Sequence, residues 1–285
     1  MKKLLLPLLA LMSLLSCNDP EIVDPEKATV RLKMEHHFNG TPIDFDSEFV
    51  TSYGDTIQFS VFKYYLSNLV FMDDEGNEFA LEESYYLVST EESNIQEIEI
   101  SDLEAGDFTS FKLSVGVDSV ANSSITDASG DLDPNGADGM IWNWNVGYKF
   151  VNTEGTYKND STSGSFVLHL GKDENYKTFN FGSMTDDHSD HSAVMRISEI
   201  EEEDDSMEME HSSEGTLAIS LDEGKTTEIH LMVDLAELFE SPNEISLAET
   251  NTSHGTNATL FMDNIEHSSD EDANGWFTLH HITTQ

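Results

Sequence analysis

Residues 108–117 read FTSFKLSVGV, a stretch in which Phe111, Leu113 and Val115 alternate with polar or small residues. Successive side chains of a β-strand point to opposite faces, so this period of two predicts a strand with one buried face. The same alternation occurs near the start of the chain, over residues 30–37, VRLKMEHH. Strands of this kind are typical of sheets that cover a core on one side.

Similar stretches recur along the chain, separated by turns rich in glycine and aspartate. Further strands are predicted over residues 57–72, 85–88, 95–100, 166–171, 216–221, 226–233, 258–262 and 276–282. A short helix is predicted over residues 235–239. Many short strands with turns between them favour an all-β fold, and we predict an antiparallel β-sandwich with long loops.

The N-terminus has the pattern of a lipoprotein signal peptide. Lys2 and Lys3 precede an apolar stretch over residues 4–15, and the sequence LLSC ends at Cys17, the only cysteine of the chain. The apolar stretch is shorter than the roughly 20 residues that a membrane-spanning helix needs, as expected of a signal peptide. We therefore predict a signal peptide over residues 1–16 and lipidation of Cys17. An ordinary secretory signal with an incidental cysteine is the alternative.

The rest of the predicted organisation follows from composition. Residues 17–27 are polar, contain two prolines and are expected to tether the lipid to the fold. Residues 28–285 are expected to form one domain, with an acidic insertion rich in histidine and methionine at about 183–213. Acyl chains on Cys17 would hold the protein at a membrane. We predict a cell-envelope protein at the outer membrane of a Gram-negative bacterium, facing the periplasm or the surface.

The charge of the chain excludes two classes of partner. The sequence has 56 acidic and 13 basic residues, for a formal net charge of −43. Such a surface repels the phosphates of nucleic acids and of anionic lipids, so neither is expected to bind. Hydrophobic residues make up 38% of the chain, which is enough for a core, and most carboxylates are expected to form a solvated surface.

Residues 139–155, GMIWNWNVGYKFVNTEG, are the most specific stretch of the chain. This segment resembles the signature of the MbnP-like family, the copper-binding proteins associated with methanobactin loci and related to copper-repressed surface proteins of methanotrophs. Other blocks that appear in the family's order are residues 35–43, 65–68, 113–118, 166–171 and 257–264. The segment departs from the signature at Ile141, Asn143 and Val146, where the family has Tyr, Thr and Ser.

The resemblance implies a copper site that serves copper acquisition or storage. Related proteins bind copper through histidines and a tryptophan oxidised to kynurenine, and the resemblance implies a dihaem partner enzyme of the MauG type for that oxidation. The candidates for the modified residue are Trp142 and Trp144. The residues alone leave the alternative that both are core aromatics, because they alternate on one face.

Histidines on predicted strands are candidate ligands, because imidazole binds copper and zinc. His36 shares the face of the inward residues of its strand, whereas His37 is expected to point outward. His169 lies on an apolar strand and is also expected to point inward. Each inward histidine has the alternative of being a hydrogen-bonded core residue. Together with the resemblance, these patterns predict a copper site made of His36 or His37, His169, and one of Trp142 and Trp144.

Residues 183–213 offer a second, weaker metal-binding candidate. The histidines and methionines there resemble flexible metal-scavenging stretches, and the nearby acids would attract cations. The residues concerned are His188, His191, Met207, Met209 and His211. The alternative is an unstructured acidic loop with incidental histidines. No pairing is predicted for His254, His267, His280 or His281.

The sequence contains no nucleophile elbow, no HExxH motif and no phosphate-binding glycine loop. We therefore predict a binding protein rather than an enzyme. Two other functions remain open on the same sandwich. One is an interaction or adhesion lipoprotein that binds no metal, and the other is a carbohydrate-binding or hydrolase module.

Overall fold

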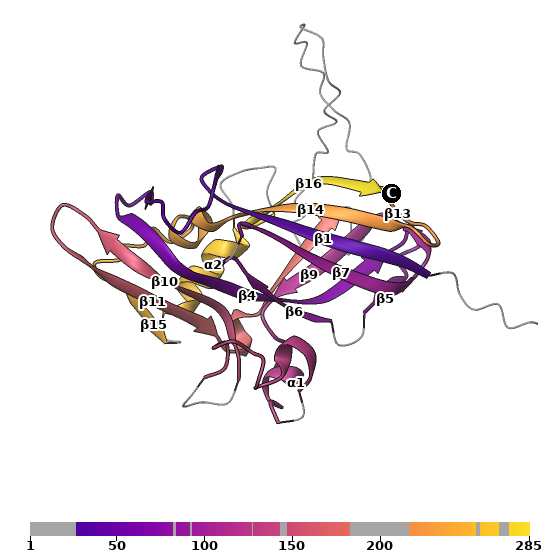
Figure 1. The fold of residues 1–285 in the computed structure, drawn as a ribbon, viewed down its shortest axis with the longest axis horizontal. Helices are drawn as coiled ribbons and strands as arrows, with labels where there is room; N and C mark the ends of the chain where they lie inside the picture. The colour runs from indigo at the N-terminus through magenta and orange to yellow at the C-terminus, as the bar shows by residue number, and fades with distance from the viewer. Residues whose placement is uncertain are drawn as a thin grey trace, which may run out of the picture.

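The computed structural model describes residues 27–81, 84–91, 93–126, 128–142, 147–182, 217–254, 257–267 and 274–285. Within these residues the strands form two main sheets and a two-stranded ribbon (Figure 1). The smaller sheet has the order β16 (Phe277–Thr284), β14 (Thr226–Asp234), β1 (Lys27–Phe38) and β2 (Thr41–Pro42). Strand β7 (Ile95–Glu104) also pairs with β1.

The larger sheet is built around the 17-residue strand β4 (Thr56–Met72). Its order is β12 (Lys177–Gly182), β9 (Ser110–Val115), β4, β10 (Lys149–Lys158), β11 (Ser163–Gly171) and β15 (Thr252–His254). The short strands β3 (Phe49–Val50), β5 (Glu78–Ala80) and β6 (Tyr85–Ser89) also pair with β4. The ribbon consists of β8 (Gly106–Phe108) and β13 (Ile219–Leu221).

The core lies between the two sheets and confirms the predicted β-sandwich. Val30, Leu32 and Met34 of β1 are buried, as the period of two predicts, and β11 contributes Phe166 and Leu168 from the facing sheet. Burial of one such side chain contributes about 1.5–3 kcal/mol. Two strand pairs, β1 with β14 and β11 with β15, are parallel. The sandwich is therefore mixed rather than purely antiparallel.

A second apolar cluster covers the outer face of the larger sheet. It joins Tyr65 of β4 to Met140 and Tyr148 of the segment that includes α1 (Ser119–Asn122) and the 3-10 helix Gly130–Leu132. The Tyr148 hydroxyl donates to the carbonyl oxygen of Leu132 at 2.7 Å. Figure 1 shows α1 on the side of the larger sheet away from β1. This cluster fixes the tryptophan-containing segment against the sheet.

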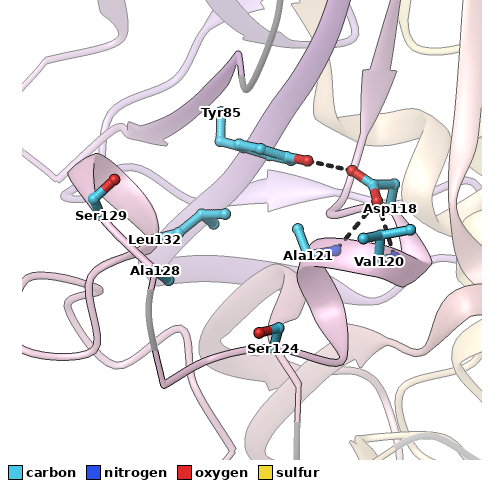
Figure 2. A pocket seen from close by; sticks show the side chains of 8 residues that line it. All are labelled: Tyr85, Asp118, Val120, Ala121, Ser124, Ala128, Ser129 and Leu132. Carbon is cyan, nitrogen blue, oxygen red and sulfur yellow. Dashed lines mark hydrogen bonds between the residues drawn. The ribbon is translucent and has the colours of Figure 1, made fainter.

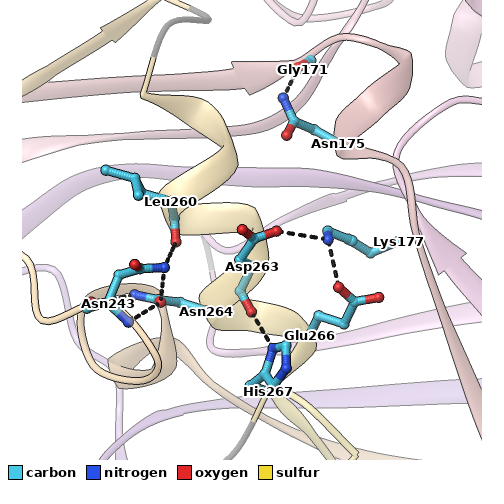
Figure 3. A network of polar contacts seen from close by, with 9 residues as sticks. All are labelled: Gly171, Asn175, Lys177, Asn243, Leu260, Asp263, Asn264, Glu266 and His267. Carbon is cyan, nitrogen blue, oxygen red and sulfur yellow. Dashed lines mark hydrogen bonds and ion pairs between the residues drawn. The ribbon is translucent and has the colours of Figure 1, made fainter.

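The helix α2 (Ala258–Glu266) lies where the sequence predicted a strand over residues 258–262, so that prediction is wrong. Its amide Asn264 is buried and donates to the carbonyl oxygens of Leu238, at 3.1 Å, and Asn243, at 2.7 Å. These bonds tie α2 to the 3-10 helix Leu235–Phe239, which confirms the short helix predicted there. Figure 3 shows Asn264 and Asn243 beside Lys177, whose ammonium group lies between two carboxylates of α2.

Several predictions concern residues outside the described ones. They are the signal peptide, Cys17 and its tether, and the insertion at about 183–213, which follows the end of β12 at Gly182. Among the residues that are described, no helix is long and apolar enough to cross a membrane.

Candidate metal centre

Three strands of the larger sheet place Lys63, Asn152 and His169 in one row. Asn152 of β10 pairs with Lys63 of β4 on one side and with His169 of β11 on the other. Residues directly opposite each other on neighbouring strands project from the same face of a sheet. The parallel pairing of β11 with β15 also brings the backbone of His254 opposite His169.

This row lies on the face of the larger sheet that points away from the core. Phe166, Leu168 and Leu170 are buried in the core, whereas His169 alternates with them and is only partly buried. The prediction that His169 points into the core is therefore wrong. Trp142 covers this outer face near His169 and Gly171.

Trp142 lies against His169 on this face. Its side chain is buried, with 7% exposure for the residue, and its indole nitrogen donates to the carbonyl oxygen of Tyr148 at 3.1 Å. The rings of Trp142 and His169 meet edge to face, with centroids 5.8 Å apart. A Cβ at Gly171 would lie 2.7 Å from the carbonyl oxygen of Tyr148, so glycine allows β11 to approach this segment closely. The structure thus brings together two of the predicted ligands.

Charged groups surround the pair. His169 Nε2 lies 3.0 Å from Glu154 Oε1, and Lys149 Nζ lies 6.0 Å from the centre of the Trp142 ring. Burial lowers the pKa of Lys149, although Glu154 acts in the opposite direction. The amide oxygen of Asn152, beside His169 in the row, is buried and has no hydrogen-bond partner. Beside Trp142 the face therefore offers the imidazole of His169, the carboxylate of Glu154 and the unsatisfied amide oxygen of Asn152.

Lys63, at the other end of the row, is held by two carboxylates. Its ammonium group pairs with Glu91 at 2.8 Å and with Asp138. Burial lowers the pKa of Lys63, but the hydrogen bonds to Asp138 and Glu91 outweigh it and raise the pKa overall. Lys63 therefore stays charged and limits how many cations this face can accept.

His36 lies in the core, as its strand period predicted. Its Nδ1 donates to the carbonyl oxygen of Asn94 at 2.8 Å, and its Nε2 lies 2.9 Å from the Tyr64 hydroxyl. Burial lowers the pKa of His36 to about 4, so the ring is neutral. Tyr64 points into the core while its neighbour Lys63 belongs to the row of His169, and the larger sheet therefore separates His36 from His169. The structure does not place these two predicted ligands around one point.

His37 shares the outward face of β1 with Glu35, as predicted, yet it is covered, with 6% exposure. Its Nε2 lies 3.2 Å from Glu35 Oε1. Since β1 belongs to the smaller sheet, His37 lies on the opposite side of the sandwich from the row of His169.

One histidine group was missed by sequence reasoning. In the described part of the chain, one group of at least three histidine, cysteine or carboxylate residues lies close enough to hold a single ion. It consists of His230, His280 and His281. His230 lies on β14, and the other two lie on β16. The adjacent pair His280-His281 was the available signal, but alternation along a strand assigns neighbouring residues to opposite faces.

A cavity of about 400 Å³ lies between β6 and α1 (Figure 2). Tyr85 and Asp118 meet across it, and Asp118 also accepts hydrogen bonds from the backbone nitrogens of Val120, at 3.0 Å, and Ala121, at 3.2 Å. Burial acts to raise the pKa of Asp118, but these hydrogen bonds outweigh it and lower the pKa. Asp118 is thus an ionised helix cap, which is a poor arrangement for a general acid.

The remaining candidate residues lie outside the described ranges. They are Trp144, His188, His191, Met207, Met209 and His211.

A family model described as MbnP matches residues 27–258. Among solved structures, MbnP from Methylosinus trichosporium is similar to the chain, with 13% sequence identity, 81% of each chain covered and a TM-score of 0.46. None of the curated proteins matches the chain.

Proposed function

This chain belongs to the MbnP family, and from that premise we propose that it is a copper-binding protein of the cell envelope whose site is built on His169 and Trp142. The observation that carries the proposal is the contact between these two rings, because Trp142 belongs to the segment with the most specific sequence of the chain. We propose a role in copper acquisition or storage rather than catalysis.

The donor set beside Trp142 fits copper in part. An imidazole is a good copper ligand, and the carboxylate of Glu154 and the unsatisfied amide oxygen of Asn152 are weaker ones. An intact indole has only an N–H donor and cannot ligate a metal. A complete site on this face therefore needs a further nitrogen ligand, and oxidation of a tryptophan to kynurenine would supply an aniline nitrogen.

The modification is proposed for Trp142, because it contacts His169, with Trp144 as the alternative. A dihaem enzyme of the MauG type is the proposed partner for the oxidation. Glu154 would hold the ring of His169 in place by accepting a hydrogen bond from Nε2. The burial of Trp142 would keep bulk water from the site.

Attachment to the membrane is proposed through a lipid on Cys17. The tether that follows would place the sandwich at the outer membrane, facing the periplasm or the surface. The large negative charge would concentrate cations near the protein, since charged surfaces attract counter-ions.

Mass spectrometry and metal analysis of one sample test this proposal. We expect protein from the native host to carry copper, and its peptide with Trp142 and Trp144 to be about 4 Da heavier than calculated, because two oxygen atoms are added and CO is lost. Recombinant protein made without the partner enzyme should lack both features. Native protein with unmodified tryptophans and no copper would contradict the proposal and favour an interaction lipoprotein.

Matched variants locate the site. Trp142→Phe and Trp144→Phe, each produced in the native host, should differ, with copper lost only from the variant whose tryptophan is modified. His169→Ala should also lose this copper, whereas His267→Ala should keep it, because His267 is an exposed residue at the end of α2. Retention of full copper by His169→Ala would remove His169 from the site.

A further inference from the structure

Three histidines from two neighbouring strands form a compact triangle on the outer face of the smaller sheet. The ring centroids of His230 and His280 are 5.0 Å apart, and those of His230 and His281 are 4.9 Å apart. The rings of His280 and His281 are also 4.9 Å apart. One nitrogen from each ring lies within 4.8 Å of the others.

A β-bulge explains how two adjacent residues face the same partner. His230 of β14 pairs with His281, and the next residue, Leu231, pairs with Leu279, so His280 is an extra residue on β16. In a bulge two residues oppose one residue of the neighbouring strand, and the strict alternation of side chains is broken. The bulge therefore turns both His280 and His281 toward His230.

The arrangement has the features of a metal-binding group. His230 is buried, with 5% exposure, and its Nδ1 has no hydrogen-bond partner. Buried polar atoms are normally satisfied, and this one is free to bind an ion. His280 is exposed and His281 is partly exposed, which leaves a path for an ion from solvent. The Nδ1 atoms of His280 and His281 lie 2.7 Å apart, so small rotations of these accessible rings would present both to one ion.

Carboxylates flank the triangle from two strands. Glu35 Oε2 of β1 lies 3.3 Å from His230 Nε2, and Glu228 Oε1 of β14 lies 3.8 Å from His281 Nε2. Carboxylates in this position orient ligating imidazoles and raise their basicity. Lys33, opposite His230 on β1, acts against a bound cation. Burial first, and then Lys33, His281 and His280, lower the pKa of His230 against the opposing effect of Glu35.

We propose that His230, His280 and His281 bind one divalent transition-metal ion, Zn²⁺ or Cu²⁺, at a site separate from the one on the larger sheet. Three imidazoles with nearby carboxylates and no sulfur suit these ions. Because His230 lies on β14 and the other two histidines lie on the edge strand β16, the bound ion links the last strand of the chain to the sheet.

Titration of the metal-free mature chain with ZnCl2 and, separately, with CuCl2 tests the proposal. The test variant is the double substitution His280→Gln and His281→Gln, at accessible positions of an edge strand. We expect wild type to bind one equivalent more than the double variant. The affinity of the single variant His280→Gln should fall by more than about 100-fold, because even groups outside the ligand set contribute about 10–100-fold.

Thermal unfolding gives a second readout. Metal should raise the Tm of wild type and of His267→Gln, an exposed histidine outside the triangle, but not that of the double variant. If only one of the two ions raises the Tm of wild type, that ion is the one that the triangle binds. Equal stoichiometry, affinity and Tm shift in wild type and in the double variant would overturn the proposal. The loss of one equivalent caused by the double substitution should also occur in a His169→Ala background, so failure of the site on the larger sheet is distinguishable from failure of this one.

Discussion

Replacement of Gly155 by alanine should lower the free energy of unfolding by about 3 kcal/mol, the upper part of the usual range for inserting an extra group into a packed core. A Cβ at this position would lie 2.1 Å from the carbonyl oxygen of Gln58 and 2.7 Å from the ring of Phe166. The backbone of Gln58 belongs to β4, which pairs with β10 at this point. It cannot move away without breaking the ladder between these strands.

The position also lies at an irregularity of the sheet. The register of β10 against β4 shifts between Glu154 and Gly155, and Glu154 is the residue that holds His169. Strain at Gly155 should therefore disturb the row of His169 as well as the core. Position 155 requires glycine because any side chain there would clash with the backbone of β4 and with the ring of Phe166.

Urea unfolding followed by tryptophan fluorescence measures the effect. Gly136→Ala is the matched control, because Gly136 is exposed and its nearest neighbour to an added Cβ is 3.8 Å away. That substitution should change the stability by less than about 0.5 kcal/mol. Equal unfolding free energies for wild type and Gly155→Ala would show that β4 and β10 can separate here at little cost.

The period of side chains predicted most of the strands and the burial of His36, because β1 has a core on one face and Glu35 and His37 on the other. The period of side chains does not predict the direction of His169. The core covers one face of β11 and Trp142 covers the other near His169, so apolar neighbours do not tell which way the histidine points. Parallel pairing of β1 with β14 depends on residues far apart in the chain and has no local signal.

Two other differences have local causes. Residues 258–262 are apolar enough to resemble a strand, yet the buried residues of α2 are Ala258, Phe261, Met262 and Ile265 among others, which is the spacing of a helix. The triangle of His230, His280 and His281 depends on a β-bulge that the alternation of residues does not predict. Residue type alone therefore suggested candidate ligands, whereas their grouping in space depends on the register of the strands.

When the pH is lowered from 7 to 4.5, the free energy of unfolding should fall by about 2.5 kcal/mol more in wild type than in His36→Gln. Burial holds the pKa of His36 at about 4, against 6.5 for a free histidine. Between these values the unfolded chain takes up a proton that the folded chain does not, so acid favours unfolding. The stabilisation that depends on a neutral His36 is fully present above pH 6.5. It is lost as the pH falls toward 4, at about 1.4 kcal/mol per pH unit.

The difference between two pH profiles isolates this effect. The chain has 56 acidic residues, and their protonation changes the stability of wild type and of the variant alike, so it cancels when one profile is subtracted from the other. A chelator in all samples removes any metal-dependent term. His267→Gln should follow the wild-type profile, because His267 is exposed. Parallel profiles for wild type and His36→Gln would mean that the folded core accepts a protonated His36, and that its hydrogen bonds to Asn94 and Tyr64 do not fix the neutral ring.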